Sequence, residues 1–177
     1  MRDLELKVAR VAIERTPSGT VNASDPGTPG AAKASAPLVL VAEDDPIYGE
    51  MAAYTLGDFG FSVVLVADGA QALQHVAARM FDVIIFDINL PNLDGLSAIR
   101  ALRSMGPNIA TPVVVMTGET ESGTALDAYK AGVTSFLRKP IDWVAFPKMI
   151  AQLLAGSKAL AEEKILMDKV RRLASGT

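Results

Sequence analysis

The sequence predicts an α/β fold in which one parallel sheet is covered by helices on both faces. Short apolar runs alternate along the chain with stretches that space their apolar residues as helices do, and there are five of each. The central run, Val83–Phe86, is apolar throughout, which is typical of a strand buried on both faces. Strands that alternate with helices indicate a parallel sheet, because a crossover between parallel strands needs a helix-length connection.

Two segments precede the alternating region. Residues 1–15 place Leu4, Val8 and Val11 at helical spacing among charged residues, which predicts a short amphipathic helix that is marginal on its own. Residues 16–37 are dense in Gly, Pro, Ser, Thr and Ala, the composition of a flexible linker.

The alternating region follows over residues 38–156. Its predicted strands are Leu38–Ala42, Ser62–Ala67, Val83–Phe86, Pro112–Thr117 and Ser135–Arg138. Its predicted helices are Pro46–Leu56, Ala70–Met80, Leu96–Ser104, Ser122–Ala131 and Val144–Leu154. Asp45, Asp68 and Asp142 precede three of these helices and suit N-caps, whereas Pro147 predicts that the last helix starts late or bends. Residues 157–177 predict a helical tail in which Leu166, Val170 and Leu173 are spaced like a coiled-coil seam, with Glu163 at the preceding position.

Composition excludes several classes of protein. No apolar run reaches the roughly eighteen residues that a membrane span needs, and the N-terminus lacks the apolar stretch of a signal peptide. The chain has no cysteine, so disulfides and thiolate metal sites are excluded, and a cytoplasmic location fits. The single histidine, His75, argues against a histidine-based metal site.

Charge is distributed unevenly along the chain. Residues 37–156 hold seven basic and thirteen acidic groups, which makes this region a poor electrostatic match for nucleic acid. Residues 157–177 hold five basic and three acidic groups, so any affinity for a polyanion is expected to lie in the tail.

Polar side chains follow the carboxyl ends of the predicted strands. In parallel sheets, ligands bind just beyond these ends. Glu43, Asp44 and Asp45 follow the first strand, Asp87 the third, Thr117 ends the fourth, and Lys139 follows the fifth. Three neighbouring carboxylates, Glu43, Asp44 and Asp87, repel one another unless a cation is present, and all-oxygen ligands favour Mg²⁺. Together with a lysine and a hydroxyl, they make a constellation for phosphoryl transfer. Asp45, directly before Pro46, is expected to cap a helix instead.

Residues 38–156 resemble the receiver domain of the two-component response regulators. The motifs that carry the resemblance are Glu43-Asp44-Asp45 after an apolar strand, the stretch from Asp87 to Gly95, Thr117-Gly118, and Phe136-Leu137-Arg138-Lys139-Pro140. The resemblance implies a flavodoxin-like (βα)5 fold with strand order 2-1-3-4-5.

The resemblance also implies a role for each site residue. Asp87 would be the phosphoacceptor, and Mg²⁺ would be bound by Asp44, Asp87, the Asn89 carbonyl and, through water, Glu43. Thr117 would be the switch hydroxyl, Lys139 the phosphate-binding lysine and Phe136 the aromatic switch residue. Asn89 and Glu119 occupy positions that tune autodephosphorylation in receivers, which implies a phosphoform that decays over seconds to minutes.

The resemblance implies a signalling protein rather than an enzyme with an external substrate. Its phosphoryl donor would be a histidine kinase or a histidine phosphotransfer protein. The tail is too short for a DNA-binding domain, so output is expected through contacts with an unidentified protein, and a homodimer through the tail stays open. One alternative is a receiver-fold scaffold that is not phosphorylated. Another is a Mg²⁺-dependent phosphatase of the haloacid dehalogenase type, although that family places a second Asp where this chain has Asn89.

Overall fold

A computed structural model describes residues 35–104, 106–118 and 122–175. The chain divides into two units, Met1–Ser35 and Ala36–Thr177, and the second contains the whole alternating region. The helix and the linker that the sequence predicts before residue 35 lie outside the described residues.

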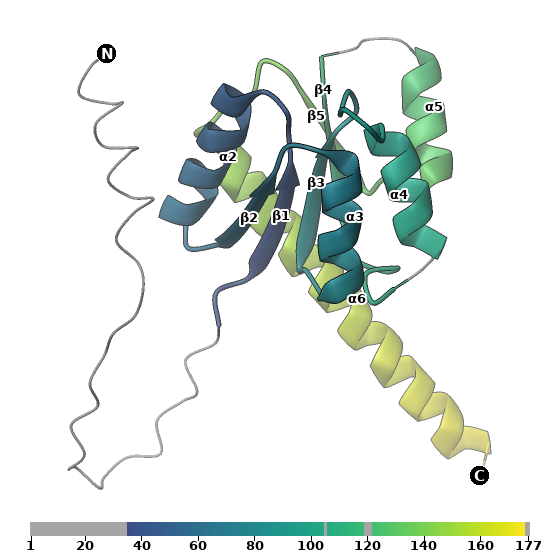
Figure 1. Cartoon of the computed structure of the whole chain (residues 1–177). Coiled ribbons are helices and arrows are strands. Elements are labelled where there is room, and N and C mark those ends of the chain that lie inside the picture. The colour runs from purple at the N-terminus through teal and green to yellow at the C-terminus, as the bar shows by residue number, and fades with distance from the viewer. Residues whose placement is uncertain (1–34, 105, 119–121, 176–177) are drawn as a thin grey trace, which may run out of the picture. The chain divides into compact units, whose positions relative to one another are not determined.

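The second unit contains a five-stranded parallel sheet in the order β2-β1-β3-β4-β5, which confirms the predicted fold (Figure 1). The strands are β1 (Leu38–Ala42), β2 (Ser62–Val66), β3 (Val83–Asp87), β4 (Val113–Thr117) and β5 (Ser135–Arg138). The helices are α2 (Pro46–Asp58), α3 (Gly69–Ala78), α4 (Gly95–Ser104), α5 (Ser122–Ala131) and α6 (Phe146–Ser175). Each strand lies within one residue of its predicted bounds.

Helices cover the sheet on both faces, and a separate apolar core fills each side. Leu40 and Phe86 point toward α3 and α4 and pack with Ile99 of α4. Val41 and Ile85 point to the other face, where they pack against α2 and the first turns of α6. Every residue of the central strands β3 and β4 is therefore buried, as the continuous apolar runs predict.

Helix starts are set by aspartates, as predicted. The Asp45 side chain accepts hydrogen bonds from the backbone N–H groups of Ile47 (2.8 Å) and Tyr48 (3.3 Å) at the start of α2. Asp68 accepts equivalent bonds at the start of α3. These side chains satisfy N–H groups that have no partner within the helix.

The last predicted helix and the predicted helical tail form one continuous helix. The structure shows no break at the boundary expected at residue 156. α6 runs continuously from Phe146 to Ser175, and its second half extends away from the sheet (Figure 1). Pro147 is accommodated in the first turn, where a missing N–H costs no intrahelical hydrogen bond. No helix in the described part of the chain combines the length and the apolar character that a membrane span requires.

The edge of the sheet where the strands begin is held by two polar side chains. Asn108 is fully buried, accepts a hydrogen bond from Phe81 N (2.8 Å) and donates to the carbonyls of Val76 (2.6 Å) and Arg79 (2.7 Å). The Arg103 guanidinium donates to carbonyls on both sides of β4, including those of Thr111 (2.8 Å) and Gly132 (2.8 Å). The ends of α3, α4 and α5 are thereby connected to one another.

Candidate functional site

The opposite edge, where the strands end, collects the side chains that the sequence singles out. The parallel register pairs Ala42 with Phe86 and Asp87 with Met116, so the ends of β1, β3 and β4 are level. Glu43 and Asp44 therefore leave β1 beside Asp87. One carboxylate oxygen of each of these three residues lies within 4.8 Å of the other two, as the sequence predicts.

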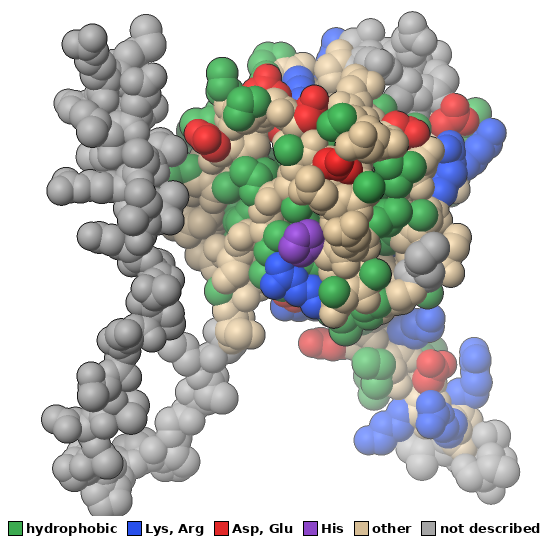
Figure 2. Space-filling view, viewed as in Figure 1, with side chains coloured by type: hydrophobic (Ala, Val, Ile, Leu, Met, Phe, Trp, Pro, Cys, Tyr) green, Lys and Arg blue, Asp and Glu red, His purple; other side chains and the backbone are tan. Residues whose placement is uncertain are grey.

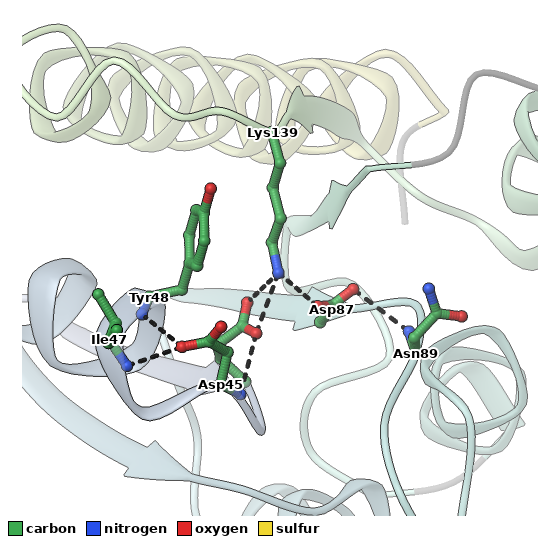
Figure 3. Close-up of polar contacts among 7 residues, drawn as sticks. Asp45, Ile47, Tyr48, Asp87, Asn89 and Lys139 are labelled. Carbon is green, nitrogen blue, oxygen red and sulfur yellow. Dashed lines mark hydrogen bonds and ion pairs between the residues drawn. The ribbon is translucent and has the colours of Figure 1, made fainter.

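Lys139 contacts both buried carboxylates of this cluster, those of Glu43 and Asp87, and Figure 3 shows its side chain reaching toward Asp87. Its Nζ is 2.6 Å from Asp87 Oδ2 and 2.8 Å from Glu43 Oε2, and it donates a hydrogen bond to Glu43 Oε1 (3.0 Å). Burial lowers the pKa of Lys139, but the hydrogen bonds and charges of Asp87 and Glu43 outweigh burial and raise it. The lysine is thus held in its charged form against the Asp87 carboxylate.

The pKa of Glu43 is strongly shifted in this site. Burial raises its pKa to about 7 from its usual value of 4.5, and the charge of Asp87 adds to the rise, while Lys139 opposes it. Glu43 Oε2 is buried and has no hydrogen-bond partner among the described residues, although it lies in ion-pair range of Lys139. A buried oxygen without a hydrogen bond, next to one exposed and one buried carboxylate, fits a hard divalent cation or one of its waters.

Of the remaining predicted residues, the structure shows Asn89 in contact with this cluster. Asn89 N donates to Asp87 Oδ1 (3.2 Å), and the Asn89 side chain is exposed. Thr117 is buried at the end of β4, whereas Phe136 on β5 is exposed. Glu119 lies outside the described residues, so the predicted pairing of Asn89 with Glu119 around the acceptor stays a prediction.

Tyr48 belongs to the site but is missed by reasoning from the sequence. Its ring centroid is 4.5 Å from Lys139 Nζ, within the range of a cation–π interaction. Tyr48 also contacts Trp143 (5.7 Å between centroids), which in turn packs edge-on against Phe146 at the start of α6 (5.6 Å). The only sign of this role in the sequence is that Tyr48 follows Asp44 by four residues, about one helical turn. That spacing would place the Tyr48 ring on the same side as the acidic residues.

Glycine allows the loop after Asp87 to fold back onto the backbone of Asp87. A Cβ placed on Gly95 would lie 2.1 Å from the carbonyl oxygen of Asp87. A Cβ on Gly69 would lie 2.0 Å from the carbonyl oxygen of Leu93 in the same loop. The loop is therefore packed between Asp87 and the start of α3, and a hydrogen bond from Asn92 to Asp68 joins the loop to α3.

Comparison with known proteins agrees with this geometry. The family model of the response regulator receiver domain matches residues 39–151. The chain is 33% identical over 128 residues to the transcriptional regulatory protein ZraR of Escherichia coli O157:H7. It is 34% identical over 130 residues to the transcriptional regulatory protein PrrA of Mycobacterium leprae. The matches cover 72% and 73% of this chain but only 27% of ZraR and 52% of PrrA.

Two solved structures resemble the fold. One is the chemotaxis protein CheY4 of Vibrio cholerae, with a TM-score of 0.63 and 31% identity, covering 66% of this chain and 98% of CheY4. The other is the receiver domain of the sensor histidine kinase PA1611 from Pseudomonas aeruginosa, which has a magnesium ion coordinated in its active-site cleft. Its TM-score is 0.63 at 28% identity, and the match covers 68% of this chain and 98% of that one.

Proposed function

Since the chain belongs to the response regulator receiver family, a family of signalling domains, we propose that it accepts a phosphoryl group on Asp87 and signals in the cytoplasm through protein contacts. The observation that carries the proposal is the placement of the Lys139 ammonium 2.6 Å from Asp87 Oδ2, beside two further carboxylates. A structural ion pair would need one acid and one base. Here Lys139 pairs with two of three clustered carboxylates, which leaves the site short of positive charge.

The donor is a phosphohistidine of a histidine kinase or a phosphotransfer protein. An Asp87 carboxylate oxygen attacks the phosphorus in line, an O–P bond forms, the N–P bond to the donor breaks, and the electron pair returns to the imidazole. Lys139 turns from the carboxylates toward a phosphoryl oxygen and stabilises the negative charge there. The Thr117 hydroxyl, at the end of the neighbouring strand, donates to a second oxygen, and Phe136 turns inward from its exposed position.

Mg²⁺ is the proposed cofactor, because the donor set contains only oxygen and its three carboxylates lie within 4.8 Å of one another beside a single ammonium. Asp44, Asp87 and the Asn89 carbonyl would hold it directly, with Glu43 acting through water. When bound, the ion would neutralise the carboxylates and the charge of the transferring group. The test of the proposal is incubation of the full chain with acetyl phosphate and Mg²⁺, followed by intact mass. An unmodified protein under conditions that phosphorylate a control receiver would contradict it.

Replacing Asp44 is expected to weaken Mg²⁺ binding far more than replacing its neighbour. Asp44→Ala removes an exposed carboxylate of the acidic cluster, whereas Asp45→Ala removes a helix cap worth about 1 kcal/mol. Mg²⁺ titration can be followed by the fluorescence of Trp143, which contacts Tyr48 beside Lys139. The two variants serve as controls for each other, and a larger loss of affinity in Asp45→Ala would show that the acidic ligands are misassigned.

Without metal, the protein is expected to lose stability as pH rises through the range set by Glu43. The folded state holds a proton on Glu43 up to about pH 7, whereas the unfolded state releases it near 4.5. The free energy of unfolding should therefore fall between these values, by on the order of 2 kcal/mol. Urea unfolding in chelator at about pH 5 and about pH 8 measures this difference.

Glu43→Gln supplies the control for this pH dependence, because it keeps the shape of the side chain but cannot titrate. The difference in stability between wild type and variant should change with pH in chelator, and Mg²⁺ should abolish most of that change. The raised pKa would be contradicted if, in chelator, the free energy of unfolding of the wild type rose relative to that of Glu43→Gln as the pH increased over this range.

A further inference from the structure

The second half of α6 presents an apolar face to solvent. Leu160, Leu166, Met167 and Val170 lie on it and are each 51–69% exposed. Figure 2 shows apolar, acidic and basic side chains together along this protruding part of the chain. We call the surface formed by Leu160, Glu163, Leu166, Met167 and Val170 the tail face.

The tail face does not continue the side of α6 that packs on the sheet. Ile150 and Leu154 are buried in the core and define that side. At 3.6 residues per turn, Leu166 and Val170 each lie about 160° around the helix from Ile150. The apolar side of α6 therefore faces the sheet in the first half of the helix and faces away from that direction in the second half. The core residues that pack against Ile150 and Leu154 cannot cover the tail face as well.

Contact between α6 and the rest of the second unit ends near the start of the tail. Lys158 forms an ion pair with Asp82, which precedes β3 (3.6 Å). Beyond Lys158 the described side chains of α6 are exposed, apart from the half-buried Asp168. A helix of this length without tertiary packing is marginal in water, and an amphipathic one is stabilised when another surface covers its apolar side.

We propose that the tail face pairs with the tail face of a second copy of this chain, in antiparallel orientation. Residues 160, 163, 167 and 170 follow the alternating spacing of three and four that forms a seam between two helices. Two copies related by a two-fold axis would cover each other's apolar residues and close the assembly at a dimer.

Charge selects the antiparallel orientation. Glu163 is the one charged residue in the tail face, and a parallel pair would place both Glu163 carboxylates in the same layer of the seam, where they repel. An antiparallel pair moves each Glu163 toward the basic end of the partner helix, which carries Lys169 and Arg171. Glu162 on the flank of the face is moved the same way.

The first experiment measures oligomeric state in the full chain by light scattering or sedimentation. The wild type is expected to dimerise, and Met167→Glu should raise the dimer dissociation constant on the order of a hundredfold or more, because it buries a charge in the seam. Ile165→Glu is the matched control: Ile165 is as exposed as Leu160 but lies on the opposite side of the helix, so this variant should still dimerise.

Orientation can be read by cross-linking, because the chain has no cysteine of its own. A single cysteine at Met167, near the middle of the seam, should cross-link to its counterpart. A single cysteine at Leu160 should not, since antiparallel helices centred on residue 165 would hold the two copies about 15 Å apart along the helix axis.

Three results would overturn the proposal. A wild type that stays monomeric at high concentration would exclude the pairing, and efficient self-cross-linking of Leu160→Cys would exclude the antiparallel orientation. A monomer that dimerises only after removal of residues 1–34 would show that this segment covers the tail face instead. Phosphorylation of Asp87 enters none of these measurements, so the outcome is independent of the proposed function.

Discussion

Asp87→Asn is expected to abolish phosphorylation by acetyl phosphate and Mg²⁺ while the protein stays folded. The amide oxygen can still accept a hydrogen bond from Lys139, but a neutral amide is a poor nucleophile and a poor metal ligand. The substitution also removes a negative charge beside Glu43, so the repulsion that helps to raise the pKa of Glu43 is lost. Intact mass should show no phosphoryl adduct, and urea unfolding should keep a single cooperative transition.

Asp94→Asn is the control for this experiment, because Asp94 lies in the same loop but serves the backbone. Its carboxylate accepts a hydrogen bond from Ser97 N (2.9 Å) at the start of α4, a role that asparagine also fills. This variant should be phosphorylated like the wild type. Undiminished acid-labile label on Asp87→Asn would disprove the assignment of the acceptor.

Gly95→Ala is expected to cost both stability and phosphorylation. The new Cβ would lie 2.1 Å from Asp87 O and 3.0 Å from Asp87 C, which are backbone atoms and cannot rotate away. Relief requires a shift of the Asp87 backbone, so we expect a loss of about 1–3 kcal/mol in the free energy of unfolding and slower labelling of Asp87.

Gly57→Ala provides the contrast within the same fold. Nothing in the described part of the chain lies within 4 Å of a Cβ at Gly57, and the residue belongs to helix α2, so alanine should stabilise by up to about 1 kcal/mol. Denaturant unfolding of the two variants measures both effects. Equal stability and equal labelling in Gly95→Ala and wild type would show that the loop does not constrain the acceptor.

Much of the fold could be predicted from the sequence because its signals are local. Branched apolar runs mark β3 and β4, and an aspartate before Pro46 or Gly69 marks a helix start. The length of α6 could not be predicted in the same way. Its apolar residues change sides along the helix, so no single periodic stripe joins Ile150 to Val170.

The residues of the candidate site could be predicted from the sequence, but the shifted pKa of Glu43 and the contact of Tyr48 with Lys139 could not. Strand ends place Glu43, Asp87 and Lys139 together once the sheet is assumed to be parallel. That Glu43 is buried deeply enough to titrate near neutrality depends on everything packed around it. The same holds for Tyr48, whose ring covers Lys139 only because α2 packs on this face of the sheet.

The polar contacts made by Asn108 and Arg103 have a mechanical consequence. They join the ends of α3, α4 and α5 at the edge of the sheet farthest from Asp87, and the carbonyls they hold belong to three separate connections. These hydrogen bonds are expected to restrain that edge of the sheet when the structure around Asp87 changes. If phosphorylation of Asp87 moves these helices, we expect the helix ends beside Asp87 to move more than the ends that Arg103 and Asn108 hold.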